Sequence, residues 1–279
     1  MTTVASPKHP AAVDVDNLPS RTTPAPPASP ATPVHDDSPA LRRLTGGLLI
    51  AVPVAFTAIF VALGVVFDYP DILAAPTDEV LRSFAAGGDG LVALWYAFML
   101  TAVGFAPISV LLPRALGLGG TLAAMSVVFG VIAAALQFIG LARWPFLVPY
   151  LSDTYLDPQS TPAAREAAAV TFQAFHSFAG GALGEHLGYL FTAAWTLLLA
   201  AGIHRVLGRP LLAALGAASA LGVAAGMLEP LGIEAAGLVN AVAYSVWALW
   251  LVLVGVLLLR GPVDAHAPAS STPVVGGGT

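Results

Sequence analysis

Apolar residues occur in six long runs along the chain, and short polar segments separate one run from the next. A helix needs about 20 mostly apolar residues to cross the roughly 30 Å hydrocarbon core of a membrane, and each run reaches or approaches that length. The pattern therefore predicts an all-α fold, a polytopic transmembrane helix bundle with six spans. The predicted spans are Leu44 to Phe67, Leu91 to Leu112, Thr121 to Ala142, Leu183 to Ile203, Leu211 to Leu228 and Ile233 to Leu259.

Both ends of the chain lack such runs. Residues 1–40 contain nine prolines among Ala, Ser, Thr and Asp, with hardly a large apolar side chain, and residues 261–279 are similar. Segments of this composition bury too little apolar surface to offset the entropy that is lost on ordering. We therefore expect two disordered cytoplasmic tails around one transmembrane domain, residues 41–260, with long outer loops at 68–90 and 143–182.

The composition excludes several classes of protein. Hydrophobic residues make up 57% of the chain and charged residues only 10%, against about 25% charged in soluble domains. The absence of cysteine excludes disulfides, thiolate metal sites and thiol nucleophiles. The few basic residues are too dispersed for nucleic-acid binding, and no phosphate-binding loop or nucleophile elbow motif is present. The one partner that the composition itself implies is the lipid bilayer.

Basic residues divide unevenly between the two sides of this six-span topology. Cytoplasmic loops of membrane proteins carry the excess of Lys and Arg. Only Arg82, Arg143 and Arg165 lie on the poorer side. We therefore predict a multi-pass protein of a bacterial cell membrane, with both termini cytoplasmic. The basic residues on the richer side are Lys8, Arg21, Arg42, Arg43, Arg114, Arg205, Arg209 and Arg260.

Each of the two outer loops carries the signals of a helix that leads into a span. In the first loop, Thr77 follows a proline and precedes two acids, which suit the positive end of a helix dipole, and Gly87 and Gly88 can stop the helix. In the second loop, Thr161 is a candidate N-cap before Pro162, and the pair at 180–181 can end or kink the helix. The similar strings SFAAGG and SFAGG also suggest a weak parallel repeat.

The fourth predicted span carries a polar stripe. On a helix Glu185, Tyr189, Thr192 and Thr196 fall at i, i+4, i+7 and i+11, which places them on one face. Polar groups in hydrocarbon cost several kcal/mol unless they are satisfied, so this face should meet other helices or water. One interpretation is a vestibule open to the outside, in which Glu185 and the adjacent His186 bind a cation, relay protons or hold a polar ligand.

The alternative interpretation needs no ligand. Glu185 and His186 would then lie at headgroup depth, in the first turn of a helix that favours acids, and the threonines would bond back to their own carbonyl groups. Elsewhere, Gln137 in the third span and Asn240 in the sixth either converge on Glu185 or simply hydrogen-bond neighbouring helices. The sequence leaves both pairs of alternatives open.

A metal site is not expected, and no cofactor is implied. His176, Glu185 and His186 offer ligand types that zinc accepts. However, Glu185 is nine residues from His176, which is about 180° around an α-helix, so only a break near 180–181 could bring the two together. No recognised ligand spacing is present. For most of the aromatic residues Trp95, Tyr96, Trp144, Tyr150, Trp247 and Trp250 we expect interfacial or lipid-facing positions, with no ligand.

From Leu44 to Arg260, the order of spans and the words FDYPDIL and LVALWYAF resemble a family of uncharacterised multi-pass membrane proteins found in actinobacteria and other bacteria. This family is known as a domain of unknown function. The resemblance implies a helical membrane fold. It implies no activity and no catalytic residue.

Three hypotheses for the function follow. The first is transport or sensing of a small polar solute or cation that meets Glu185, His186 and Tyr189, with Gln137 and Asn240 deeper in the bundle. The second is a membrane-embedded enzyme that acts at the outer leaflet through His176, Glu185 and His186. The third is a non-catalytic subunit whose outer loops bind a protein partner of unknown identity.

Overall fold

The computed structural model describes residues 38–233 and 235–261, and every regular element within these ranges is a helix. Both expected tails therefore lie almost wholly outside the described residues. Six helical stretches are long and apolar enough to cross a membrane, which confirms the predicted six-span, all-α bundle. The six stretches are Pro39–Phe67, Thr77–Ala115, Gly120–Leu156, Pro162–Leu207, Pro210–Leu231 and Ala235–Leu259.

Each span packs against the spans before and after it in the sequence, and the last span packs against the first, so the six helices form a ring. The main contacts join α1 to α2, α2 to α3, α3 to α6, α6 to α7 and α7 to α8, and α8 returns to α1. Short connections favour this order because they hold consecutive helices antiparallel and adjacent. The core helices are α1 (Pro39–Phe67), α2 (Thr77–Ala115), α3 (Gly120–Phe146), α6 (Gly188–Leu207), α7 (Pro210–Ala225) and α8 (Ala235–Leu259).

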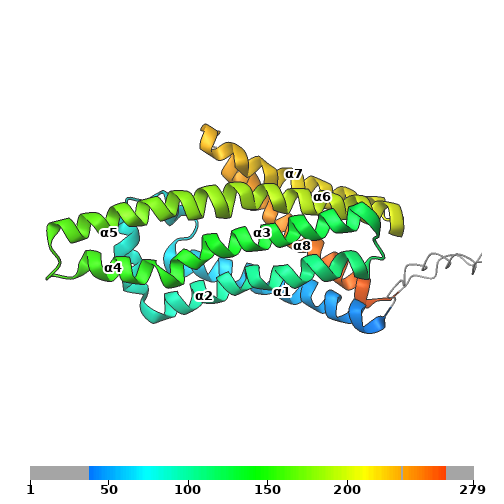
Figure 1. Ribbon diagram of the computed structural model, residues 1–279, viewed down its shortest axis with the longest axis horizontal. Coiled ribbons are helices and arrows are strands. Elements are labelled where there is room, and N and C mark those ends of the chain that lie inside the picture. Colours follow the sequence, from blue (N-terminus) through cyan, green and yellow to red (C-terminus); the bar gives the residue numbers. More distant parts are fainter. Residues whose placement is uncertain (1–37, 234, 262–279) are drawn as a thin grey trace, which may run out of the picture. The chain divides into compact units, whose positions relative to one another are not determined.

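The bundle has two different ends, which Figure 1 shows at the right and the left. We call the right-hand end, where α1 begins and α8 finishes, the terminal end. Gly46 of α1 lies against Gly255 and Leu259 of α8 there. We call the opposite end, which carries the short helices α4 and α5, the loop end (Figure 1). The outward orientation of the loop end stays a prediction.

The loop end is built largely from helices: the helices predicted within the two outer loops are present, and η2 (Asp71–Ala74) and α4 (Val148–Leu156) are two that the sequence did not predict. The helix predicted within the second loop is α5 (Pro162–Phe175). The predicted start of α5 is confirmed, because the Thr161 side chain accepts a hydrogen bond from the Ala164 backbone N–H at 3.2 Å. Helices α2 and α3 also extend further towards this end than their apolar runs.

Glycines shape both helices that enter spans from the loop end. In α2 the helical geometry breaks at Gly88, which has φ 55°, a conformation that favours glycine, so the predicted stop is a kink within a longer helix. In the second case α5 does not end. It continues through a π-helix, η3 (His176–Leu187), into α6 and forms one stretch of 46 residues.

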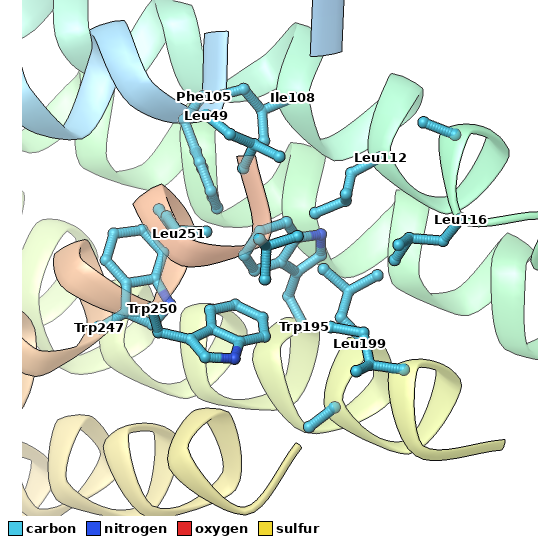
Figure 2. Packing of buried hydrophobic residues seen from close by; sticks show 14 of the residues in the cluster. Leu49, Phe105, Ile108, Leu112, Leu116, Trp195, Leu199, Trp247, Trp250 and Leu251 are labelled. Carbon is cyan, nitrogen blue, oxygen red and sulfur yellow. The ribbon is translucent and has the colours of Figure 1, made fainter. Parts of the chain in front are cut away.

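Two buried apolar clusters fill the bundle. The terminal-end cluster includes Trp195, Trp247 and Trp250, whose rings lie among leucines from neighbouring helices (Figure 2). The loop-end cluster includes Trp95 and Trp144, which stack with ring centroids 4.5 Å apart. All five tryptophans are at most 7% exposed. The expectation of interfacial or lipid-facing positions is therefore wrong for the tryptophans, whose rings bury large apolar areas between helices and hold the bundle together. Tyr96 and Tyr150 are exposed, as that expectation required.

Candidate functional site

The inner part of the polar stripe is closed interhelical packing. Gln137 Nε2 of α3 donates a hydrogen bond to Thr192 Oγ1 at 2.9 Å, and Trp247 Nε1 of α8 donates to Thr196 Oγ1 at 2.8 Å. Thr196 Oγ1 itself donates to the Thr192 carbonyl at 2.8 Å. Both threonine residues are fully buried. These hydrogen bonds join three helices and leave no water-exposed threonine in the stripe.

Asn240 lies at the contact of α7 and α8. Its Nδ2 donates to the Val223 carbonyl at 2.7 Å. The contact is possible because Gly226 has no side chain: a Cβ there would collide with the Asn240 amide and lie 2.8 Å from Tyr189 Cδ2. The structure thus brings Asn240 and Tyr189 to the same place, but the polar group that Asn240 binds is the backbone of α7.

Glu185 and His186 are half-buried in η3. They do not lie in the first turn of a helix, because the continuous helix begins more than twenty residues earlier, at Pro162. The first-turn part of the ligand-free interpretation is therefore wrong, while its predicted bond from a threonine to a carbonyl of the same helix is present at Thr196. The headgroup depth of Glu185 and His186 stays a prediction. Their environment is set by the packing of η3 against α3.

The π-helix changes which residues share a face. Its hydrogen bonds run to the fifth residue along the chain, so each turn holds between four and five residues. The nine residues from His176 to Glu185 then make about two full turns, where an α-helix would place them on opposite faces. Gly180 lies between them on the same face. The break that the sequence required near 180–181 is therefore a widened helix.

This face of η3 meets Arg143, in the last turn of α3. Arg143 is only 8% exposed, and its Nη1 donates to the Gly140 carbonyl within its own helix. The guanidinium lies against Gly180, where a Cβ would be 2.6 Å from Arg143 Cζ and from Nη2. It also lies 5.2 Å from the centre of the Trp144 ring. The glycine is thus what makes room for a buried cation.

The backbones of α3 and η3 touch beside this arginine. A Cβ on Gly140 would lie 2.8 Å from the Cα of Gly184, and one on Gly184 would lie 3.0 Å from the Cα of Gly140. Small residues recur at every fourth position here, at 180, 184 and 188. Such stripes let membrane helices approach closely. The close approach brings Glu185, which follows Gly184, to the side of α3 that carries Arg143.

Two buried nitrogen atoms at this contact lack hydrogen-bond partners among the described residues, Arg143 Nε and His176 Nδ1. The described part of the chain also places no carboxylate within 4 Å of the Arg143 guanidinium. His176 stacks on Phe172 with ring centroids 5.4 Å apart, which fixes the plane of the imidazole. Buried polar groups are normally hydrogen-bonded, so these two nitrogen atoms are exceptions that need an explanation.

Tyr69, in the connection between α1 and η2, packs edge-on against Trp95 with ring centroids 5.1 Å apart, and Trp95 stacks on Trp144, the residue next to Arg143. Burial of its hydroxyl raises the pKa of Tyr69 to about 12, the negative charge of Glu185 adds to the rise, and the positive charge of Arg143 opposes it. Tyr69 thus experiences both charges. We call Tyr69, Arg143, His176 and Glu185 the loop-end polar cluster.

Neither Arg143 nor Tyr69 is among the site residues that the sequence predicts. The predicted spans place Arg143 at the start of an outer loop, although it stands within the apolar string GLARWPFLVPYL. An arginine in the middle of such an apolar run is the signal that could have identified it. An ionisable side chain within an apolar membrane helix almost always faces the interior of the bundle and often marks a functional site. Tyr69 gave no signal of its own.

Within the described residues, no three His, Asp or Glu side chains are grouped so that they could hold a metal ion. The cluster instead combines one cation, one carboxylate, an imidazole and a phenol. Such a set can bind a polar molecule by charge-assisted hydrogen bonds.

No curated protein and no solved structure matches the chain. A family model does: the one described as a domain of unknown function, DUF4386, matches residues 44–255. That range contains all four residues of the loop-end polar cluster. With most of its length matched, this six-span membrane protein belongs to the DUF4386 family.

Proposed function

We propose that the protein binds a small polar solute or cation at the loop-end polar cluster and transports or senses it across a bacterial cell membrane, with both termini in the cytoplasm. The observation that carries this proposal is the buried Arg143 guanidinium, whose Nε has no partner among the described residues. Removing a charge from water without a close counter-ion costs several kcal/mol. Ionisable groups inside membrane proteins are kept at that cost mainly where they bind or move something.

The surroundings of the cluster support entry from the loop end. Glu185 and His186 are half-buried, Ala182 is exposed, and a Cβ at Gly181 would meet no atom within 4 Å. The cluster therefore reaches the surface of the bundle along η3. Towards the terminal end the path is closed, because the buried threonines of α6 bond to α3 and α8.

A small cavity lies further along the closed side. It has a volume of about 30 Å³ and is bordered by Thr101, Gln137, Tyr244 and Trp247 among apolar side chains. A water molecule needs roughly 10–15 Å³ of such space, so the cavity has room for one or two. A site that is open towards the loop end and closed towards the terminal end, with a small and mostly apolar cavity beyond it, is consistent with a transporter that is open to one side only.

Cysteine labelling tests the proposal directly, because the chain contains no native cysteine. A membrane-impermeant thiol reagent is added to intact cells that produce His186→Cys, Thr192→Cys or Ala86→Cys. We expect His186→Cys to react nearly as fast as the exposed control at Ala86, and Thr192→Cys to react far more slowly. If Ala86→Cys reacts and His186→Cys does not, the proposal that a water-filled vestibule leads to the cluster is wrong. Uptake into proteoliposomes then separates transport from sensing.

A further inference from the structure

The loop-end polar cluster holds two opposite charges that do not meet. Arg143 and Glu185 flank the point where the backbones of α3 and η3 touch, at Gly140 and Gly184. Nevertheless, the described residues place no carboxylate oxygen within 4 Å of the arginine nitrogens. Buried ions in proteins are usually paired directly or bind something between them. Neither charge therefore has a direct counter-ion among the described residues, and a bound group that carries both opposite charges would satisfy both.

The nitrogen atoms without partners on the arginine side indicate which chemical group of a bound molecule would lie there. Arg143 Nε and His176 Nδ1 are both buried without a partner among the described residues. Both belong to side chains on the α3–η3 contact, since His176 shares the π-helical face of Gly180, which touches the guanidinium. An oxyanion accepts hydrogen bonds from Arg and from a protonated imidazole nitrogen, and a planar carboxylate fits the guanidinium fork.

The carboxylate of Glu185 indicates which group would lie at the other end of the bound molecule. Glu185 is half-buried and acts electrostatically on Arg143 across the cluster. A simple anion at the arginine would be repelled by this carboxylate, and a simple cation at the carboxylate would be repelled by the arginine. A molecule that carries both charges avoids both repulsions.

We propose that the loop-end polar cluster binds a small zwitterion, with its carboxylate against Arg143 and His176 and its ammonium group against Glu185. This proposal rests on the function proposed above and names the class of solute. The headgroup of phosphatidylethanolamine carries the same pair of charges, a phosphate and an ammonium, so the test includes it as a second source of this chemistry.

The test measures the unfolding midpoint and the Kd of the full-length protein in detergent. The probes are three zwitterions of increasing charge separation, glycine, β-alanine and γ-aminobutyrate, with acetate and methylammonium at equal ionic strength. We expect one zwitterion to bind more tightly than either single-charge probe. Arg143→Gln and Glu185→Gln should each weaken that binding roughly tenfold or more, because hydrogen bonds to charged groups are strong.

Matched controls are available on the exposed face of the loop end. Arg82→Gln and Glu166→Gln remove the same charges from exposed residues and should leave the Kd unchanged. If Arg143→Gln does not fold, Glu185→Gln still decides the question, because Glu185 is only half-buried and its amide isostere keeps the shape.

Each outcome has a distinct meaning. If acetate and glycine bind equally well and Arg143→Gln loses both, the proposal that the ligand is a zwitterion is wrong. The proposal that the cluster binds a small polar solute would still hold. Stabilisation only in nanodiscs that contain phosphatidylethanolamine, lost in both variants, would support the same chemistry with the lipid as its source. Binding of no probe and no lipid would overturn the zwitterion. In that case labelling at His186 still decides the proposed function independently.

Discussion

The two ends of the bundle use buried polar groups in opposite ways. At the terminal-end cluster, Trp247 and Trp250 both donate hydrogen bonds, to Thr196 Oγ1 at 2.8 Å and to the Leu212 carbonyl at 2.9 Å. Trp195 Nε1 is the exception there. At the loop end, Arg143 Nε, His176 Nδ1 and Trp95 Nε1 are all buried without partners among the described residues.

This difference separates polar groups that join helices from polar groups that remain available. A satisfied hydrogen bond between membrane helices contributes a modest amount to stability and fixes their relative rotation. A buried donor without a partner is unfavourable, and stays buried only because the surrounding packing holds it there. The terminal end therefore resembles a structural core, and the loop end resembles a site.

The largest predicted effect concerns the contact that builds the loop-end site. In Gly140→Ala the new Cβ would lie 2.8 Å from the Gly184 Cα, a backbone atom that cannot move aside alone. We expect a loss of about 3 kcal/mol in the free energy of unfolding, because overpacking forces the backbones apart. Thermal unfolding in detergent measures it. The control is Gly181→Ala, where the added Cβ meets nothing within 4 Å. Equal stability of the two variants would contradict the close α3–η3 contact.

An intermediate effect is expected at the terminal end. Thr196→Val keeps the size of the side chain but removes the acceptor of the Trp247 N–H, leaving a buried donor unsatisfied. The expected loss is about 2 kcal/mol. Thr57→Val is the matched control, because Thr57 is exposed and bonds only to the Pro53 carbonyl of its own helix. If both variants unfolded at the same temperature, the buried threonines would not join the helices as described.

The smallest effect is expected at the start of α5, outside the two cores. Thr161→Ala removes the N-cap acceptor of the Ala164 N–H, which lies 3.2 Å from Thr161 Oγ1. A lost cap costs about 1 kcal/mol. Ser160→Ala, one residue earlier, is the control. Hydrogen exchange should report faster opening of the first turn of α5 alone. A change at η3 of the same size would mean that α5 and η3 open as one unit.

Local features of the fold could be read from the sequence because they depend on neighbours in the chain. A run of about 20 apolar residues is long enough to span a membrane whatever surrounds it. The cap at Thr161, the proline after it and the break at Gly88 are equally local. Rotation of the helices was not predictable in this way, because lipid is as apolar as a leucine side chain and hydropathy does not tell a packed face from a lipid-facing one. For this reason the predicted lipid-facing positions of the tryptophans were wrong.

The sequence by itself determined the class of protein, the six spans, the family resemblance and the presence of an unusual acid and imidazole at Glu185 and His186. Only the tertiary structure decided what lies beside them. The π-helix turns Glu185 onto the face of His176, and the absence of side chains at Gly180 and Gly184 lets Arg143 and the α3 backbone approach that face. Both effects depend on hydrogen-bond register and on contacts between helices about forty residues apart, which the order of apolar and polar residues does not encode.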